Sequence, residues 1–162
     1  MAKPYTGYGD KGYTQTINNK HISKSDVLID LLGTIDEFSS QLGAAKAHTS
    51  DEKIRSDIER IQKKMISVMG EIAGGNVSVT ENCVKILEEM TDSYAQGFEG
   101  FSLPGANAVS AFLDIARCVI RRAERLAVKL GQQGRIRAVT LVYLNRLSDL
   151  VYAMSRYAEN NE

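Results

Sequence analysis

Proline is scarce in this chain of 162 residues, where Pro4 and Pro104 are the only two. Proline interrupts helices because it lacks a backbone N–H donor and its ring clashes with the preceding turn. Long stretches before and after Pro104 instead carry apolar residues at spacings of three and four, which is the helical period. The scarcity of proline and this spacing together predict a mostly helical protein.

Long apolar runs and an excess of charge of one sign are also absent. No stretch of about 18 apolar residues occurs that could form a transmembrane helix, and no apolar stretch typical of a secretion signal follows the opening Met-Ala-Lys-Pro. Twenty basic residues balance twenty acidic ones, so no overall field attracts nucleic acid or an anionic membrane. We therefore expect a cytoplasmic protein with no nucleic-acid partner and no membrane partner.

Cysteine and histidine are too few to indicate a metal centre or a catalytic triad. Cys83 and Cys118 lack the spacing of metal ligands, and both follow the pattern of small apolar residues buried inside helices. His21 and His48 have no recognisable catalytic neighbours. The sequence therefore predicts reduced, buried thiols and histidines that are structural or exposed, and we assign no metal ligand.

The apolar spacing divides the chain into five helical stretches. Ser25 or Asp26 can cap the first, the pair Gly74-Gly75 ends the second, and Ser78 followed by Glu81 resembles a capping box for the third. The expected helices span about residues 27–48 and 52–73, then a third that follows Ser78 and runs through Tyr94, and then 107–130 and 136–157. Val142 is expected on the apolar side of the last helix.

Short connections between these stretches favour antiparallel neighbours. The predicted fold is therefore all-α: an up-and-down five-helix bundle over residues 26–158, preceded by an irregular segment over residues 1–25. At 162 residues the chain suits one domain, which spans residues 1–162.

The first 25 residues place Gly7, Gly9 and Gly12 among tyrosines and threonines, which is not a helical composition. One interpretation is a β-hairpin with a tight turn at Gly9-Asp10-Lys11-Gly12. The other is a cradle for phosphate, in which glycines allow successive N–H groups to face the oxygens, threonine hydroxyls add donors, and Lys11 or Lys24 supplies a charge. Composition alone leaves both interpretations open.

Four arginines gather within nine residues of the fourth expected helix: Arg117, Arg121, Arg122 and Arg125. Like charges four residues apart on a helix repel by roughly 0.2–0.5 kcal/mol per pair, so this cluster indicates a bound anion. The alternative is a solvated polar stripe in which Asp114 and Glu124 neutralise half of the positive charge. The helix alone does not decide between these two interpretations.

Five segments in one order resemble motifs of the PduO-type family of ATP:cob(I)alamin (corrinoid) adenosyltransferases, over about residues 5–155. Thr6-Gly-Tyr-Gly-Asp-Lys-Gly-Tyr-Thr14 resembles the nucleotide loop of the family, and Lys24 holds the place of a lysine that follows it. The other four segments are Gly33-Thr-Ile-Asp-Glu37, Phe101-Ser-Leu-Pro-Gly105, Arg121-Arg-Ala-Glu-Arg125 and Tyr143-Leu-Asn-Arg-Leu-Ser-Asp149. Chance does not readily produce five such matches in one order.

The resemblance implies a homotrimer of five-helix bundles with an active site at each subunit interface. ATP then binds between the N-terminal loop of one chain and the arginine helix of its neighbour. The implied reaction transfers the 5′-deoxyadenosyl group of ATP to the cobalt of cob(I)alamin and yields adenosylcobalamin (a form of vitamin B12) and triphosphate. Because cobalt is the nucleophile, no nucleophilic side chain is required, and Mg²⁺ with arginine side chains stabilises the departing triphosphate.

The resemblance also implies roles for individual residues. Arg117 and Asp36 form a salt bridge between subunits near the corrinoid, whereas the alternative for Asp36 is a local pair within its helix. Asp36 is expected to border the apolar stripe of the first helix rather than its solvent side. Phe101 packs beneath the corrin and helps to displace the lower axial ligand, and Arg121 acts in catalysis as well as in binding. The implied nucleotide contacts are Thr6, Gly7, Tyr8, Gly9, Thr14, Gln15, Lys24, Arg121, Arg122, Glu124, Arg125 and Asn145.

Some positions depart from the family pattern. Asn18-Asn19 and His21 stand where the family commonly has two glycines and an arginine, and Ala106 replaces a second glycine after Pro104. These departures motivate an alternative function, a non-catalytic sensor that binds ATP and corrinoid on the same fold. For the enzyme, a corrinoid reductase or a B12-dependent enzyme is a further expected partner.

Overall fold

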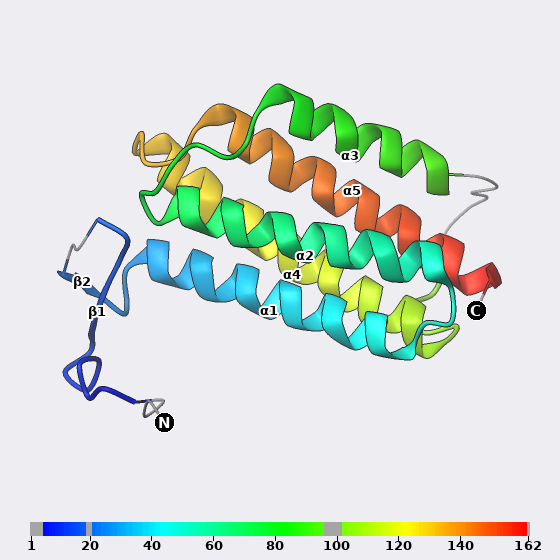
Figure 1. Cartoon of the computed structure of the whole chain (residues 1–162), viewed down its shortest axis with the longest axis horizontal. Helices are drawn as coiled ribbons and strands as arrows, with labels where there is room; N and C mark the ends of the chain where they lie inside the picture. Colours follow the sequence, from blue (N-terminus) through cyan, green and yellow to red (C-terminus); the bar gives the residue numbers. More distant parts are fainter. Residues whose placement is uncertain (1–4, 19–20, 96–101, 162) are drawn as a thin grey trace.

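The computed structural model describes residues 5–18, 21–95 and 102–161. In this part of the chain a small two-stranded sheet precedes five α-helices (Figure 1). The strands are β1 (Tyr13–Gln15) and β2 (His21–Ser23), and the helices are α1 (Val27–His48), α2 (Glu52–Ile72), α3 (Glu81–Tyr94), α4 (Ala108–Gln132) and α5 (Ala138–Asn161). The predicted all-α fold is confirmed.

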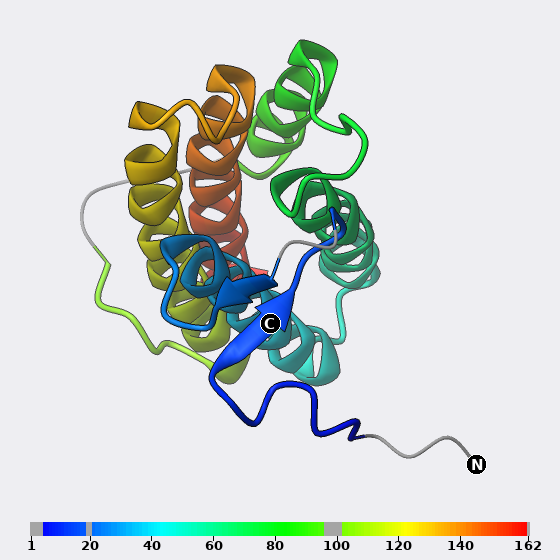
Figure 2. The same ribbon diagram turned by 90° about the vertical axis from the view of Figure 1, so that its left-hand side faces the viewer.

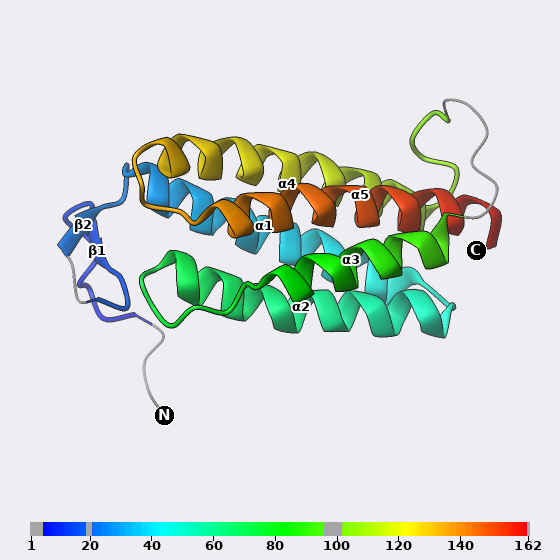
Figure 3. The ribbon, with the colours of Figure 1, turned by 90° about the horizontal axis from the view of Figure 1, so that it is seen from above.

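The helices run alternately in opposite directions along a common axis, as an up-and-down bundle requires (Figures 1 and 3). Helix α4 packs against both α1 and α5, although α1 is far from it in sequence. Helix α5 also packs against α3, and α1 against α2. None of the described helices combines the length and the hydropathy that crossing a membrane requires.

Local sequence signals explain where several helices begin and end. The Asp26 carboxylate accepts the Leu28 N–H at 2.8 Å at the start of α1. Asn107 and Ser110 form a reciprocal capping box at the start of α4. Helix α2 ends just before Gly74, whose φ of 95° lies in the left-handed region that glycine adopts readily. Because these signals are local, α1, α2 and α4 lie close to their predicted bounds, whereas α5 extends further than predicted.

The predicted capping box of Ser78 and Glu81 is wrong. Helix α3 begins only at Glu81, and its N-cap residue Thr80 makes no side-chain capping bond. The N–H groups of Ser78 and Val79 instead donate to the Glu71 carboxylate of α2, at 2.6 and 2.8 Å. A contact with another helix therefore holds Ser78 outside α3.

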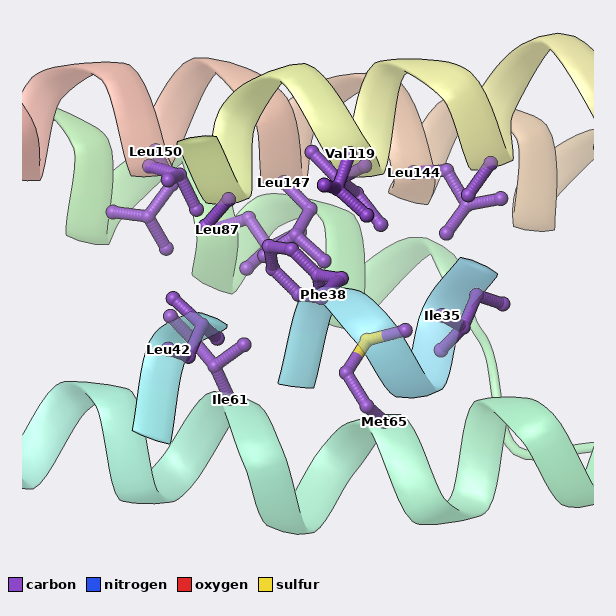
Figure 4. Packing of buried hydrophobic residues seen from close by; sticks show 14 of the residues in the cluster. Ile35, Phe38, Leu42, Ile61, Met65, Leu87, Val119, Leu144, Leu147 and Leu150 are labelled. Atoms are coloured by element: carbon purple, nitrogen blue, oxygen red, sulfur yellow. The ribbon is translucent and has the colours of Figure 1, made fainter. Parts of the chain in front are cut away.

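The core lies along the axis of the bundle, where apolar side chains from several helices meet. Figure 4 shows Ile35, Phe38 and Leu42 of α1 beside Ile61 and Met65 of α2, and these five side chains are at most 2% exposed. The same view shows leucines of α5 above them, which are Leu144, Leu147 and Leu150. Each large apolar side chain contributes roughly 1.5–3 kcal/mol when it is buried, so this shared core fixes the helices that carry the polar residues described below.

Two residues predicted to be buried are exposed. Cys118 lies on the solvent side of α4, and Cys83 is only partly buried, so the prediction of buried thiols fails for Cys118. Val142, expected on the apolar side of the last helix, is 43% exposed. The apolar spacing identified the helices correctly but did not fix the width of the buried stripe on each one.

The N-terminal strands pair as an antiparallel hairpin in which Thr14 lies opposite Ile22. The hairpin lies at the end of the bundle where α1 begins (Figure 2). The hairpin interpretation of this segment is thus correct about the strands but wrong about the turn, because Gly9-Asp10-Lys11-Gly12 precedes β1 rather than joining it to β2. The glycine-rich segment is therefore a separate structural feature.

Candidate functional site

The glycine-rich turn before β1 folds against Lys24. Gly7 and Gly12 adopt φ values of 72° and 80°. The Gly12 N–H donates to the Gly9 carbonyl at 3.2 Å, and the Lys24 N–H donates to the Gly12 carbonyl at 2.9 Å. A β-carbon on Gly9 would lie only 2.8 Å from the Lys24 Nζ atom. The missing side chain at position 9 therefore allows the ammonium group to lie against the backbone of the turn.

Side-chain hydrogen bonds join other residues that the resemblance assigns to the nucleotide. The Tyr8 N–H donates to the Thr6 hydroxyl at 3.3 Å, and the Gln15 amide donates to the Tyr8 hydroxyl at 2.8 Å. Thr14 precedes Gln15 in β1. These residues are exposed or only partly buried. The structure thus gathers the N-terminal candidates into one accessible segment.

A cleft of about 720 Å³ extends from Lys24 along α1 to Arg122 of α4. Arg122 of α4 donates to the Glu37 carboxylate of α1 and forms an ion pair with it. The Thr34 hydroxyl donates to the Asp30 carbonyl at 2.8 Å. The cleft is lined by Lys24, Ser25, Ile29, Asp30, Gly33, Thr34, Glu37 and Arg122. It therefore brings together Lys24 and Arg122, which are two of the predicted cationic contacts.

The outer face of α4, which we define by Arg121, Glu124, Arg125 and Val128, lines a second hollow of about 280 Å³. Arg121 and Arg125 are exposed, and within the described residues neither guanidinium has an ion-pair or hydrogen-bond partner. Glu124 accepts a hydrogen bond from the Asn145 amide of α5 at 2.9 Å. Two neighbouring guanidiniums that no described residue pairs with favour an anion as the ligand of this face.

Asp114 does not neutralise these arginines, because it is paired elsewhere. Its carboxylate oxygens accept hydrogen bonds from Arg156 of α5 at 2.7 and 2.6 Å, and one of them also accepts the Ser155 hydroxyl at 2.9 Å. Both charged residues of this pair are buried. The interpretation of the cluster as a stripe neutralised by Asp114 and Glu124 is therefore wrong about Asp114.

Asp36 and Arg117 lie in different surroundings. Arg117 is partly buried, and its guanidinium carbon lies 5.0 Å from the centre of the Tyr152 ring. Asp36 is exposed and has no hydrogen bond or ion pair among the described residues. The expectation that Asp36 borders the apolar stripe is wrong, because a helix turns about 100° per residue and carries position 36 away from the side of buried Ile35. A salt bridge between Asp36 and Arg117 of two subunits stays a prediction.

A third hollow, of about 680 Å³, lies where the chain enters α4. Its lining includes the apolar side chains of Ile115 and Val119 together with the Cys118 thiol. Glu37 and Arg122 line this hollow as well as the cleft beside Lys24, so the two spaces meet at their ion pair. Phe101, the predicted contact beneath the corrin, lies outside the described residues.

Sequence reasoning did not single out several residues that line these spaces. Glu37 was visible only as the last residue of Gly33-Thr-Ile-Asp-Glu37, and its pairing with Arg122 had no local signal. Ile115 and Cys118 were missed because apolar residues within a helix were expected to face the core. The sequence did place these apolar residues near the arginines, on the polar side of α4. This position could have indicated that they line an apolar surface rather than the core.

The beginning of α1 is fixed electrostatically beside Lys24. The Leu28 N–H lowers the pKa of the Asp26 carboxyl most, and the Arg135 guanidinium at 3.2 Å lowers it further, against an opposing effect of burial. Asp26 is therefore ionised at neutral pH and holds the helix start in place. Among the described residues, no group of three or more His, Cys, Asp or Glu side chains is placed to hold a metal ion.

Comparison with known proteins identifies the family. The family model for cobalamin adenosyltransferase matches residues 4–158 of this chain. A corrinoid adenosyltransferase of Citrobacter freundii is 33% identical, over 98% of this chain and 96% of its own length. A corrinoid adenosyltransferase of Bacillus subtilis is 35% identical, over 95% of this chain and 85% of its own length.

The fold agrees with this match. A solved structure of a variant PduO-type ATP:corrinoid adenosyltransferase from Lactobacillus reuteri, complexed with cobalamin and ATP, superposes with a TM-score of 0.88. The two sequences are 30% identical, and the superposition covers 98% of this chain and 94% of the other. The sequence match, the helical bundle and the order of the motifs agree, so this chain belongs to the cobalamin adenosyltransferase family.

Proposed function

We propose that this protein transfers the 5′-deoxyadenosyl group of ATP to the cobalt of cob(I)alamin. The observation that carries the proposal is a pair of exposed guanidiniums, Arg121 and Arg125, on the outer face of α4 in a member of this family, with no partner in the described part of the chain. Its relatives are corrinoid adenosyltransferases, and the Lactobacillus reuteri protein is complexed with cobalamin and ATP. The products are adenosylcobalamin and triphosphate.

The reaction explains why arginines are needed. Cobalt(I) supplies the electron pair of the new cobalt–carbon bond, and the bond between C5′ and the triphosphate oxygen breaks. Triphosphate leaves with that bonding pair, so negative charge grows on its oxygen during the step. Cationic groups that already face this oxygen lower the barrier, and arginine suits the task because its planar guanidinium binds phosphate oxygens with two parallel hydrogen bonds.

The nucleotide is proposed to lie between the glycine-rich turn and the arginines of α4. The backbone of the turn and the Lys24 ammonium, which lies against Gly9, face the phosphates. Arg121, Arg122 and Arg125 contact the triphosphate. The remaining proposed nucleotide contacts are Thr6, Gly7, Tyr8, Thr14, Gln15, Glu124 and Asn145. The hydrogen bond from Asn145 to Glu124 supports a shared role for these two residues, because it fixes one side chain relative to the other.

A homotrimer is the proposed assembly, with ATP between the N-terminal segment of one chain and the outer face of α4 of the next. The apolar side chain of Val128 supports a partner on this side of α4, since it is 39% exposed in the single chain. Large apolar residues next to unpaired charges are typical of a surface that another molecule covers. The same assembly would allow Asp36 of one chain to pair with Arg117 of another.

Mg²⁺ is proposed to accompany ATP. The described residues do not form a cluster of metal ligands, but Mg²⁺ is commonly held by substrate phosphates and only one or two carboxylates. The carboxylates of Asp30 and Glu37 line the cleft beside Lys24 and fit that limited requirement. The ion would neutralise part of the triphosphate charge.

The corrinoid is proposed to occupy the side of the hollow lined by Ile115 and Val119. Its apolar wall suits the flat corrin ring, and a contact of Phe101 with the corrin is part of the proposal. The Ser102 hydroxyl donates to the Glu159 carboxylate at 2.9 Å, which fixes the chain directly after Phe101. A corrinoid reductase or a B12-dependent enzyme is the proposed protein partner, in the cytoplasm.

An anaerobic assay of cob(I)alamin with MgATP tests the proposal. We expect adenosylcobalamin to form, and Arg121→Ala to reduce the rate about 10²–10³-fold, as loss of a group that stabilises charge in the transition state typically does. Asn145→Ala should also lose most activity, and both variants should keep the assembly of the parent protein in light scattering. Lys129→Ala, which removes an exposed charge elsewhere on α4, is the control.

Two results would contradict this assignment. Normal turnover of both Arg121→Ala and Asn145→Ala would show that the site is elsewhere. Tight binding of ATP without any turnover under strong reduction would instead favour the sensor that Asn18 and Ala106 suggest. An obligate monomer in solution would exclude the shared site between subunits.

A further inference from the structure

A cavity of about 270 Å³ lies between α2, α3 and α5, and its lining includes none of the residues assigned above to ATP or to the corrinoid. Its volume is slightly below the range of about 300–1,000 Å³ that is usual for ligand pockets, which suits a small molecule. The lining residues are Arg60, Ile61, Lys64, Cys83, Ile86, Leu87, Met90 and Tyr143.

Tyr143 gives this cavity a hydroxyl that is available for hydrogen bonding. The residue is only 2% exposed, and its hydroxyl makes no hydrogen bond within the described residues. Burial raises the pKa of Tyr143, so the hydroxyl stays protonated and can donate. Among the described residues the Tyr143 hydroxyl is not one of the enclosed unpaired polar atoms, so it is open to the cavity that Tyr143 lines. An acceptor atom of a ligand could take the place of water there.

The charged residues of the cavity are both cationic. Arg60 has no ion pair or hydrogen bond among the described residues. Lys64 donates a hydrogen bond to the Ser78 carbonyl at 2.5 Å and also interacts with the Cys83 thiol, and its three donors leave one for a ligand. No carboxylate belongs to the lining. The donors and the net positive charge of this lining favour an anion.

The polar and apolar groups are separated along the cavity. The Lys64 ammonium and the Cys83 thiol both donate to the Ser78 carbonyl, at 2.5 and 3.7 Å, so they meet at one end. Leu87 and Met90 follow Cys83 on α3 by about one and two helical turns, which places them towards the other end. A ligand that matches this order has a charged head and a hydrocarbon chain.

We propose that this cavity binds a small amphipathic carboxylate. The carboxylate accepts hydrogen bonds from the Tyr143 hydroxyl, Arg60 and Lys64. The hydrocarbon chain lies along Leu87 and Met90, where it replaces water against an apolar wall. Free phosphate would satisfy the cations but would leave this wall uncovered, so it is a weaker match than a carboxylate with a chain.

Calorimetric titration of the full-length protein with octanoate is the direct test. We expect saturable binding with one octanoate per chain, and no change in its affinity when ATP is saturating, because the cavity shares no residue with the proposed nucleotide site. Three related probes separate the contributions: acetate lacks the chain, 1-octanol lacks the charge, and octylammonium reverses it. All three should bind at least about tenfold more weakly than octanoate.

Two substitutions locate the head group. Tyr143→Phe removes only the hydroxyl, which has no hydrogen-bond partner among the residues that the structure describes, so the variant should fold normally and bind octanoate about tenfold or more weakly. Arg60→Ala should have a similar effect on binding. Lys63→Ala is the matched control, because it removes a positive charge from α2 next to the cavity without belonging to the lining.

The Cys83 thiol reports on occupancy. Although burial opposes it, hydrogen bonds with Thr80 and the nearby Lys64 ammonium lower the pKa of Cys83, so alkylation by iodoacetamide should be measurable. In a Cys118→Ser background, which removes the exposed thiol, octanoate should slow alkylation at least about fivefold at saturation. Several results would overturn the proposal: no octanoate binding at millimolar concentration, equal binding of octylammonium, or unchanged affinity in both Tyr143→Phe and Arg60→Ala. None of them would bear on adenosyl transfer.

Discussion

Helix α4 carries charge on two sides, and the two sides differ in how the charge is satisfied. On the outer face of α4, Arg121 and Arg125 are exposed without partners among the described residues. At the junction with α5, Asp114 and Arg156 are buried and joined by hydrogen bonds of 2.6–2.7 Å. Arg156 also pairs with Glu159 at 2.7 Å. At the junction with α5 the charges are paired within the chain, whereas on the outer face of α4 the described charges stay available to a ligand.

This difference separates stability from function. A buried charge that loses its partner keeps the cost of desolvation and strongly destabilises the fold. An exposed charge without a partner among the described residues has little influence on the stability of the fold. The presence of such a charge therefore needs an explanation other than stability. Substitutions in the two regions should therefore give opposite patterns of effect on unfolding and on ATP binding.

The largest loss of stability is expected at the buried junction. Arg156→Met leaves Asp114 and Glu159 without their cation, so the free energy of unfolding should fall by about 3–5 kcal/mol. Urea unfolding followed by circular dichroism, at one protein concentration, measures this change. The control is Lys63→Met, which breaks the exposed pair with Glu59 and should cost less than about 1 kcal/mol.

A second substitution sharpens this test. Asp114→Asn in the Arg156→Met background removes the uncompensated carboxylate and should recover part of the lost stability. A loss below about 1 kcal/mol in Arg156→Met alone would mean that the buried junction behaves like a surface pair. The contrast between the two sides of α4 would then fail.

The fold could be predicted largely from local sequence, because helix period and capping are local properties. Asp26 and Asn107 cap their helices, and Gly74 follows the end of α2. The capping box at Ser78 failed for a reason that lies outside the local pattern, since the Glu71 carboxylate competes for the same backbone N–H groups. Tertiary contacts of this kind decide where a loop ends and a helix begins.

In expected effect on stability, Glu71 lies between the buried junction and the outer face of α4. Its carboxylate is largely buried and accepts hydrogen bonds within the chain. Burial raises its pKa, but the N–H groups of Ser78 and Val79, the Thr140 hydroxyl and Arg137 together lower the pKa of Glu71 below its usual value. Glu71→Gln should lower the free energy of unfolding by about 2 kcal/mol at pH 7, since hydrogen bonds to a charged group are weakened. Urea unfolding at pH 7 measures the loss.

The pH dependence of this variant has a definite sign. Because the folded pKa of Glu71 lies below the unfolded one, its contribution is complete above the unfolded value of about 4.3 and is lost as the pH falls through the folded value. The difference between parent and Glu71→Gln should therefore shrink on acidification. Glu89→Gln, at an exposed position of α3, should show no comparable change. A constant difference at all pH values would contradict the assignment of charge to Glu71.

The candidate site was less accessible to sequence reasoning than the fold. The glycine-rich segment and the arginine cluster were visible as local patterns, and the order of motifs gave the family. The partners of these residues were not visible: Asp114 pairs with Arg156 and Glu37 with Arg122, each pair across two helices. Pairing between helices depends on the rotation of each helix about its axis, and an apolar stripe fixes that rotation only coarsely.

The smallest effect on folding is expected on the outer face of α4. Arg125→Gln relieves repulsion with Arg121, so the unfolding free energy without ATP should rise by up to roughly 0.5 kcal/mol or stay unchanged. With ATP, the variant should bind about tenfold or more weakly, so the rise in melting temperature that ATP gives should be smaller than in the parent. The matched control is Lys129→Gln, which removes a charge one turn further along the same helix and should keep the full effect of ATP. If Arg125→Gln instead unfolded the free chain and left the ATP effect intact, this arginine would belong with Arg156 as a structural charge, and the outer face of α4 would lose its role in binding.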